Sequence, residues 1–513
     1  MSWTGGYVSD IEYTGGYYSE QNPVLLNFAA LLEGFEPVAA GQEYTYFELG
    51  FGKGHTVNLL ASANPLGRFY AADFNPAHVA GARALAQAAQ LPNVTLLENS
   101  FAELAQGAVE LPQFDYITLH GIYTWVTREN QQCIVDFIAR YLKPGGIVYV
   151  SYNAMPGWSS VQPLQRLLVE YGDAFPNRSD VQVSHGAEFI KKLVATDAAY
   201  FQGGGTLQVR LKGLNSHHPN YLVHEYMHKH WQPMYHADVA RDFSEAKLDY
   251  VASADLPMAY NKLYLNDEKQ ALVDTFPNSA MKETMKDYYL NTSFRKDIYV
   301  RGARHLPSLR RAAMLREFGL ALIIPRDDVK LDLSLGIGNI SAKPELALPL
   351  CDALSRRPHT LAELEALPAL QGRNLEDIVQ LAALLTASRQ TVLYHSRHET
   401  LPTDAVQRMN VAIAADTRYG DECHFMASAL TGGAITVGFL SRLAYWLLAG
   451  ERMEAEPRAL AQAGWPILKA QGRVMVRDGN KLTEDSDNVA ELQARMETIV
   501  REEVPIWRKL KML

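Results

Sequence analysis

Cysteine and net positive charge are both scarce in this chain. Only three cysteines occur among 513 residues, at Cys133, Cys351 and Cys423, and no two of them form a CxxC pair. This spacing excludes a disulfide framework and a thiolate zinc site, and it favours a reducing cytoplasm. The 48 basic and 57 acidic side chains give a formal net charge of −9. Such a balance disfavours nucleic acid or anionic lipid as the main partner.

Targeting signals and long apolar runs are also missing. The first residues, MSWTGGYVSDIEYTGG, lack a basic start followed by an apolar segment, so we expect no signal peptide. The most apolar stretch, residues 429–449, is interrupted by glycines and Arg442, which predicts a buried core helix and not a membrane span. With 48% hydrophobic and 20% charged residues, the chain should form two or three globular units.

The first 150 residues alternate between strand-like and helical patterns. Strands are predicted over residues 44–49, 68–73, 94–97, 114–119 and 147–152, and helices over 50–61, 76–89 and 128–142. This alternation is typical of a parallel sheet with helices on both faces.

A glycine-rich turn follows the first predicted strand. The segment ELGFGKG, residues 48–54, lets backbone approach a ligand closely, but its spacing is GxGxG and it is entered through Glu48. An acid at this point opposes a pyrophosphate and favours a cationic group such as an amine or a sulfonium. Asp73 ends the next strand, where it could accept hydrogen bonds from a ribose or, alternatively, cap the following helix.

Four segments together resemble a known family. ELGFGKG, AADFNP, FDYITLHGIYTWV and LKPGGIVYVSYNAMPGW, in this order, are similar to the class I S-adenosylmethionine-dependent methyltransferases. The resemblance is strongest to a bacterial subgroup with a methyltransferase regulatory region, which includes rickettsial lysine methyltransferases acting on an outer membrane protein. It is specific over residues 13–158, continues through YLVHEYMHKHWQPMY and SFRKDIYVR, and fades beyond about residue 320. It implies an α/β, Rossmann-like, seven-stranded sheet and S-adenosyl-L-methionine as cofactor, with S-adenosyl-L-homocysteine as product.

The resemblance also implies a set of cofactor contacts. Glu48 would hold the amino group of the cofactor, Asp73 the ribose hydroxyls, and His120 would lie near the sulfonium. The full cofactor-binding set is Tyr18, Glu48, Gly50, Gly52, Gly54, Asp73, Phe74, Asn99, Ser100, Phe101 and His120.

Aromatic residues gather before the first strand and after the fourth and fifth. Tyr7, Tyr13, Tyr17 and Tyr18 precede the core, while Tyr123, Trp125, Tyr152 and Trp158 follow strands. Aromatic faces attract cations and exclude water, which suits a sulfonium donor and an amine acceptor; the alternative is packing under a lid. The predicted catalytic set, which would guide the acceptor, is His120, Tyr123, Trp125, Tyr152, Glu225 and Tyr226.

Six of the fifteen histidines fall between residues 217 and 236. His224, Glu225, His228 and His230 invite a metal interpretation. Their spacing follows no regular helical pattern and methyl transfer from a sulfonium needs no metal, so we expect no metal site. We assign the segment instead to orienting the substrate or closing the pocket.

Domain boundaries follow from these patterns. We expect a catalytic domain over residues 1–258, closed by an antiparallel hairpin from strands 220–225 and 248–253. It would hold a helical insertion, 159–215, whose apolar faces predict either a homodimer or a large contact with another domain. Residues 259–340 should be a helical, locally basic middle domain, either solvated or docking an acidic protein or RNA. Residues 341–513 should form a winged-helix-like module, 344–400, and then a helical remainder.

The predicted activity is methyl transfer from S-adenosylmethionine to a protein side chain, with the lysine amine favoured. Two alternatives remain: a small-molecule or RNA acceptor, and a cofactor-binding scaffold with an inactive cleft.

Overall fold

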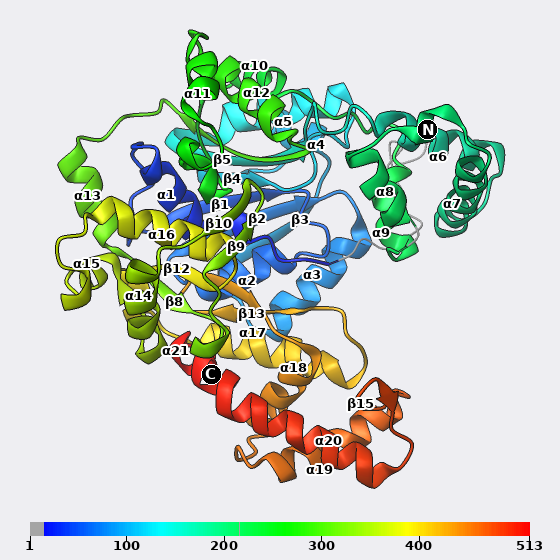
Figure 1. Cartoon of the computed structure of the whole chain (residues 1–513), viewed down its shortest axis with the longest axis vertical. Helices are drawn as coiled ribbons and strands as arrows, with labels where there is room; N and C mark the ends of the chain where they lie inside the picture. Colours follow the sequence, from blue (N-terminus) through cyan, green and yellow to red (C-terminus); the bar gives the residue numbers. More distant parts are fainter. Residues whose placement is uncertain (1–14, 215) are drawn as a thin grey trace.

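A seven-stranded sheet forms the centre of the molecule (Figure 1). The computed structural model describes residues 15–214 and 216–513. The strands are β1 (Tyr44–Leu49), β2 (Gly67–Asp73), β3 (Val94–Glu98), β4 (Phe114–Leu119), β5 (Leu142–Asn153), β6 (Leu248–Ser253) and β7 (Phe294–Arg301), in the order β3-β2-β1-β4-β5-β7-β6. The first five run parallel, and β7 is antiparallel to both of its neighbours. The predicted Rossmann-like sheet is therefore confirmed.

Helices cover both faces of this sheet because successive strand residues point to opposite sides. In β1, Tyr46 packs with one buried cluster and Phe47 with another. The covering helices are α1 (Pro23–Leu32), α2 (His55–Ala63), α3 (Pro76–Ala88), α4 (Phe101–Gln106), α5 (Arg128–Tyr141), α10 (His236–Ser244) and α12 (Ser279–Leu290). Asn22, Asn75 and Thr127 accept backbone hydrogen bonds at the starts of α1, α3 and α5, which fixes where these helices begin.

The predicted closing hairpin is wrong in one of its two strands. Residues 220–225 lie in helix α9 (Pro219–Tyr226), and β7 pairs with β6 instead. Pro219 at the first turn and the capping side chain of His218 favour a helix. Leu222, Val223 and Tyr226 are buried, and their spacing fits a helical face as well as a strand. The sheet thus extends to Arg301, past residue 258.

Buried charges attach β7 to its surroundings. Arg295 donates to Asp297 at 2.9 Å and to Asp287 of α12 at 2.8 Å. His236 and the Tyr152 hydroxyl also contact Asp297, at 2.9 and 2.7 Å. Burial disfavours the charged form of Asp297 and by itself would raise its pKa. Arg295 and His236 outweigh this effect and lower the pKa of Asp297 to about 2.

The insertion after β5 is helical, as predicted. It consists of α6 (Gln162–Ala174), α7 (Ser179–Ala195) and α8 (Thr206–Leu214), and α9 packs against it. Its own apolar residues, among them Leu164, Leu168 and Ile190, form a separate buried cluster with Trp158 and Trp231. In Figure 1 these helices project to one side of the sheet.

The middle segment, expected to be helical over 259–340, also contains strands. Its elements are α11 (Asp267–Asp274), α12, β7, α13 (Ser308–Arg316), β8 (Phe318–Leu322), β9 (Asp332–Leu335) and β10 (Gly338–Ser341). Residues 344–400 hold α14 (Pro344–Arg356), β11 (His359–Thr360), α15 (Leu361–Glu365), α16 (Leu375–Ala387) and β12 (Thr391–His395). The three expected helices and the final strand are present, with the short strand β11 added between the first two helices. The central strand of the small sheet, β8, comes from outside that range.

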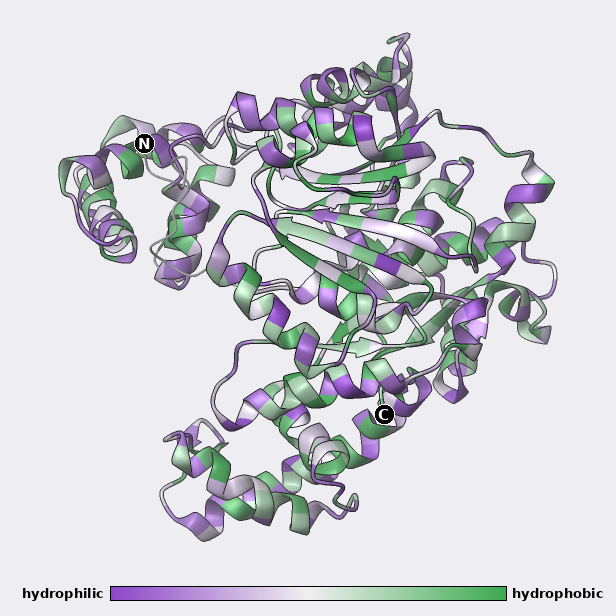
Figure 2. Cartoon of the chain, turned by 180° about the vertical axis from the view of Figure 1, so that it is seen from behind, coloured by the Kyte–Doolittle hydropathy of each residue, from purple (hydrophilic) through white to green (hydrophobic). Residues whose placement is uncertain are grey.

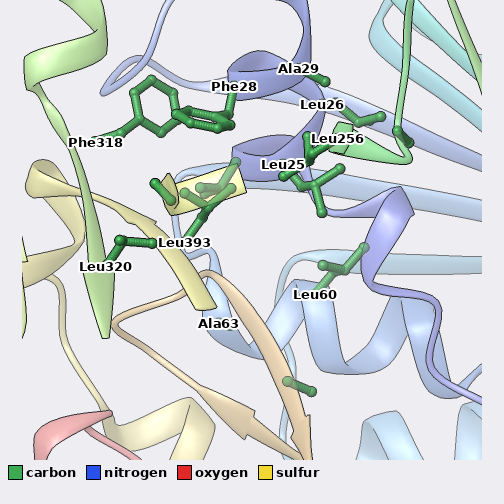
Figure 3. Packing of buried hydrophobic residues seen from close by; sticks show 14 of the residues in the cluster. Leu25, Leu26, Phe28, Ala29, Leu60, Ala63, Leu256, Phe318, Leu320 and Leu393 are labelled. Carbon is green, nitrogen blue, oxygen red and sulfur yellow. The ribbon is translucent and has the colours of Figure 1, made fainter. Parts of the chain in front are cut away.

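One hydrophobic core joins the sheet to this middle part. Phe28 of α1 lies beside Phe318 of β8, and Leu320 of β8 and Leu393 of β12 belong to the same buried cluster (Figure 3). The rings of Phe28 and Phe318 are 5.3 Å apart. Each such buried side chain contributes about 1.5–3 kcal/mol, so the middle segment is packed as part of the catalytic body.

The C-terminal part adds α17 (Asp404–Ala415), β13 (Phe425–Ser428), β14 (Gly433–Thr436), α18 (Phe439–Tyr445), α19 (Pro457–Ala470), β15 (Val476–Arg477), β16 (Asn480–Lys481), α20 (Asp485–Thr498) and α21 (Val504–Lys509). The single core helix expected over 429–449 is instead β14 followed by α18, because residues 429–432, with Gly432 at a φ of +61°, form a turn between β13 and β14. Many of the helices carry hydrophilic and hydrophobic stripes (Figure 2). In the described part of the chain, no helix is both long and apolar enough to cross a membrane.

Candidate active site

The glycine loop connects β1 to α2 at the carboxyl edge of the sheet. Gly50 and Gly54 have φ angles of +70° and +72°, a conformation that other residues rarely adopt. A Cβ atom at Gly50 would lie 2.6 Å from the end of the Ile122 side chain, so a larger residue here would also displace that side chain. The loop therefore brings backbone close to any ligand bound at this edge.

Asp73, at the end of β2, is held against that loop. Its Oδ2 accepts from the backbone N–H of Gly52 at 2.9 Å, and its Oδ1 accepts from that of Asn75 at 2.9 Å. The side chain that caps α3 is Asn75, not Asp73. Each carboxylate oxygen has two lone pairs, so Asp73 can still accept from ribose hydroxyls.

Glu48 is a buried carboxylate beside the loop. Gln21 donates to its Oε1 at 3.2 Å, while Oε2 makes no well-formed hydrogen bond with the described residues. Burial is the main reason that its pKa is raised to about 8; the charge of Asp73 adds to this, and hydrogen bonding to Gln21 and to the N–H of Val57 opposes it. An ammonium group would supply the missing partner. Glu48 thus fits the amino group of S-adenosylmethionine.

A cavity of about 460 Å³ opens over the ends of β1, β2 and β3. Its walls include seven residues of the two predicted site sets: Gly50, Asp73, Phe74, Asn99, Ser100, Phe101 and Trp125. Ser100 caps α4 through a reciprocal hydrogen-bond pair with Glu103, which fixes the turn after β3. Glu48, Gly52 and Gly54, which belong to the predicted cofactor-binding set, are not among the residues that line this cavity. We call this space the cofactor cavity.

Other residues of this wall were not predicted from the sequence. Val126, Thr127, Asn130 and His230 line the cofactor cavity. The first three sit around the N-terminus of α5, where the Thr127 cap was a recognisable signal. His230 comes from a loop after α9 that no local pattern connects to β3.

A second cavity, of about 380 Å³, adjoins the first. Trp125 lines both, and the second also contains Tyr18, His120 and Glu225 from the predicted sets. The rest of the wall consists of Gly121, Asn153, Trp158, Arg210, Tyr221, His224, His228, Ser293 and Phe294. Of these, the sequence had indicated Trp158, as part of the aromatic set, and the segment with His224 and His228, as orienting the substrate. We call this space the acceptor cavity.

His120 follows β4 and stacks on Tyr18. The two ring centroids are 3.7 Å apart, and Nδ1 of His120 lies 2.9 Å from the Tyr149 hydroxyl. Burial lowers the pKa of His120 to about 4, against the opposing effect of Glu20. The imidazole is therefore neutral at physiological pH, so it does not repel a cationic donor.

Glu225 and Arg210 form an ion pair in the wall of the acceptor cavity. Arg210 donates to Glu225 Oε1 at 2.8 Å, and its guanidinium lies 4.2 Å from the ring centre of Trp158. Burial raises the pKa of Glu225 and the charge of Arg210 opposes this rise. Nearby, the buried Nδ2 of Asn153 has no hydrogen-bond partner among the described residues.

Three of the predicted catalytic residues do not line either cavity. The Tyr123 hydroxyl donates to Asp242 at 2.9 Å within the core, and Tyr152 donates to Asp297. Tyr226 is buried against Trp158. Tyr152 and Asn153 are adjacent on β5, so their side chains point to opposite faces of the sheet. Tyr7 and Tyr13 lie outside the described residues.

A metal site was not expected, despite the histidines after residue 217. His224 and His228 have ring centroids 6.0 Å apart. Across residues 15–214 and 216–513, no three His, Cys, Asp or Glu side chains are grouped so that they could hold a metal ion.

Comparisons with known proteins agree with this geometry. Residues 41–201 match the family model described as "Methyltransferase domain", and residues 218–301 match "Predicted methyltransferase regulatory domain". The latter match contains β6 and β7, so the regulatory region supplies two strands of the catalytic sheet.

Relatives cover the chain from end to end. It is 34% identical to the uncharacterized protein sll1526 of Synechocystis over 99% of both chains, and 25% identical to RP028 of Rickettsia prowazekii over 42% of this chain and 86% of that one. The solved structure of PKMT2 from Rickettsia typhi in complex with AdoHcy shares the fold, with a TM-score of 0.70, 17% identity and coverage of 97% and 99%. The chain belongs to the family of S-adenosylmethionine-dependent methyltransferases that carry a methyltransferase regulatory domain.

Proposed function

We propose that this methyltransferase modifies proteins, and that its acceptor is the side-chain amine of lysine. The observation that carries the proposal is the acceptor cavity, which adjoins the cofactor cavity at Trp125 and combines aromatic faces with one carboxylate, Glu225. Cations are attracted both to aromatic faces and to carboxylates. The resemblance to the rickettsial lysine methyltransferases points to the same acceptor.

The charges around the acceptor cavity suit an amine. Burial lowers the pKa of His228 to about 3, and that of His120 to about 4, so both rings are neutral at pH 7. Arg210 is already neutralised by Glu225. A lysine entering this cavity thus meets no uncompensated positive charge.

Lysine must lose a proton before it can accept a methyl group. Its ordinary pKa is about 10.4, and transfer into a poorly solvated cavity lowers that value. S-adenosylmethionine, when bound, supplies the electrophilic methyl group. Glu225 and the side-chain amide of Asn153 can orient the amine, and the proton passes to water because neutral His120, with its low pKa, is a weak base.

The aromatic walls of the acceptor cavity also favour methyl transfer itself. Positive charge develops on the acceptor nitrogen as the new bond forms, so Trp125, Trp158 and Tyr18 stabilise the transition state more than the neutral amine. The remaining work of the protein is to position donor and acceptor in line.

The test is to incubate the purified protein with S-adenosylmethionine labelled in its methyl group and a lysate of the producing cells. We expect label in protein bands on a gel and, after acid hydrolysis, in methylated lysine. The Asp73→Ala variant serves as the control that should lose labelling. Nuclease-sensitive label, or label in small molecules alone, would contradict the proposal.

A further inference from the structure

Three cavities follow one another along the carboxyl edge of the sheet. The cofactor cavity and the acceptor cavity share Trp125. The acceptor cavity in turn shares Ser293 and Phe294, at the start of β7, with a third cavity of about 260 Å³. The order of the cavities follows the order of the strands: the cofactor cavity lies at β3, β2 and β1, the acceptor cavity at β4, β5 and β7, and the third cavity at β7 and β6. The third cavity is thus the next space that a chain extending from the acceptor cavity would meet.

The walls of the third cavity come from distant parts of the chain. Asp255 follows β6, Leu290 ends α12, and Gly336 and Ile337 form the turn between β9 and β10. A Cβ atom at Gly336 would lie 3.3 Å from Asp255 Oδ2, so the hairpin turn closely covers this carboxylate. Apolar walls from Met258 and Leu290 suit the methylene stem of a long side chain.

The basic residues around this cavity are already neutralised. Lys296 pairs with Glu20 at 2.5 Å. Arg295 is shared among three acids, Asp297, Asp287 and Glu283, at 2.9, 2.8 and 3.1 Å. Lys286 also pairs with Glu283, at 2.6 Å, and His236 contacts Asp297.

Two carboxylates remain without a full complement of partners. The side chain of Asp255 makes no hydrogen bond and no ion pair with the described residues; its backbone N–H donates to Ser253 and its carbonyl accepts from the N–H of Met258. Asp287 is completely buried, and its Oδ2 has no hydrogen-bond partner among them. Burial raises the pKa of both groups, although Lys296 and Arg295 oppose the rise. The cavity therefore has an excess of acceptor groups.

We propose that the third cavity binds a lysine or arginine side chain of the substrate polypeptide, at a position close to the lysine that is methylated. This inference rests on the proposed function. A cationic head would face Asp255, its stem would lie against Met258 and Leu290, and the peptide backbone would pass Ser293 and Phe294. Because the cofactor cavity lies on the other side, the basic residue falls on one side of the acceptor only.

A positional-scanning peptide library tests this inference. Each peptide carries one central lysine, and each flanking position is varied in turn, with labelled S-adenosylmethionine as donor. We expect lysine or arginine to be preferred about fivefold over alanine on one side of the acceptor. Equal use of basic and neutral residues at every position would overturn the inference.

Two variants connect the preference to the cavity. Asp255→Asn should abolish the preference for a basic neighbour and leave turnover on neutral-flanked peptides unchanged. Asp249→Asn, which removes an exposed carboxylate from the opposite end of β6, should keep the preference. If Asp255→Asn retains the full preference, the inference is wrong. The library result on the native protein stands even if a variant folds poorly.

A binding measurement separates this inference from the proposed function. Fluorescent peptides with norleucine in place of the acceptor lysine, with and without a flanking arginine, are titrated in the presence of S-adenosylhomocysteine. Binding that needs both arginine and Asp255 supports the cavity. If such binding occurs but no lysine peptide is ever methylated, the lysine acceptor is wrong while the cationic subsite stands. If lysine peptides are methylated but their binding needs neither the flanking arginine nor Asp255, only the inference of a cationic subsite is wrong.

Discussion

Arg210 and Glu225 form an ion pair inside the acceptor cavity, with the guanidinium 2.8 Å from the carboxylate oxygen. Arg210 also lies over the indole of Trp158. A carboxylate beside an aromatic face is the environment expected for a substrate cation, and here a residue of the helical insertion already occupies part of it. The insertion thus contributes directly to the candidate site.

Glu225→Gln should weaken binding of the acceptor. The charge-assisted contact with the incoming amine is lost, so the KM for the acceptor should rise by about tenfold, or 1.4 kcal/mol, with little change in affinity for S-adenosylmethionine. Steady-state kinetics and calorimetry measure the two quantities. Glu188→Gln, which removes an exposed carboxylate from α7, is the matched control. An unchanged KM would exclude Glu225 from acceptor binding.

Asp73→Ala should weaken binding of S-adenosylmethionine by about 1–3 kcal/mol, because a charge-assisted pair of hydrogen bonds to the ribose is removed. The substitution also frees the N–H of Gly52, which loosens the glycine loop. Isothermal calorimetry provides the measurement, with Asp136→Ala on the exposed face of α5 as control. Native affinity in Asp73→Ala, or a preference of the native protein for a nicotinamide dinucleotide, would refute the assignment.

Binding of S-adenosylmethionine should depend on pH through Glu48. The pKa of Glu48 is about 8 in the folded protein against an ordinary value of 4.5, so below pH 8 the carboxyl must release a proton to hold an ammonium group. Affinity should rise with pH by up to tenfold per unit until about pH 8. Calorimetry between pH 6 and 8 tests this, and the Glu48→Gln variant should bind weakly at every pH.

The same shift has the opposite effect on the stability of the ligand-free protein. The folded state holds the Glu48 proton more tightly than the unfolded chain, so the free energy of unfolding should fall as pH rises from about 4.5 to about 8. Glu48→Gln should therefore be more stable than the native protein at pH 8, by about 1–3 kcal/mol. Urea unfolding with and without the ligand separates the two effects. A less stable variant would contradict the raised pKa.

Trp125 and Tyr123 should respond differently to substitution by alanine. Trp125 lines both cavities, so its loss should lower turnover at least tenfold, about 1.4 kcal/mol. Tyr123 packs against Phe243 and donates to Asp242, so its loss should destabilise the fold by about 3–5 kcal/mol. Thermal unfolding and steady-state kinetics, measured on both variants, distinguish the catalytic role of Trp125 from the structural role of Tyr123. If Tyr123→Ala is stable but inactive, the tyrosine takes part in catalysis after all.

The helical insertion predicts a homodimer. Its main apolar faces pack within the insertion, but Phe175 and Val209 remain 60% and 68% exposed, and an exposed apolar surface is a candidate interface. Light scattering should give twice the chain mass, and Phe175→Asp combined with Val209→Asp should shift the protein to monomer. A monomer at all accessible concentrations would refute the dimer.

The sequence by itself determined the cofactor half of the site. The glycine loop and Asp73 are strand-end features, and the carboxyl ends of parallel strands always meet at one edge. Gly50 and Asp73 could therefore be assigned from local patterns, and Ser100 from the family resemblance; all three line the cofactor cavity. The short strands β1 to β5 were equally recognisable, because each is an apolar run bounded by turn residues.

Only the tertiary structure decided the acceptor half. Whether Tyr123 faces the cavity or the core depends on Asp242, which lies 119 residues later in the chain. The position of β7 between β5 and β6 likewise depends on pairing and buried charge, since residues 220–225 carry an apolar pattern that fits either a strand or a helix. Arg210 and Asp255 reach their cavities through long-range packing of the insertion and of β6. Such contacts have no local signature, because they are set by which distant elements bury each other's surface.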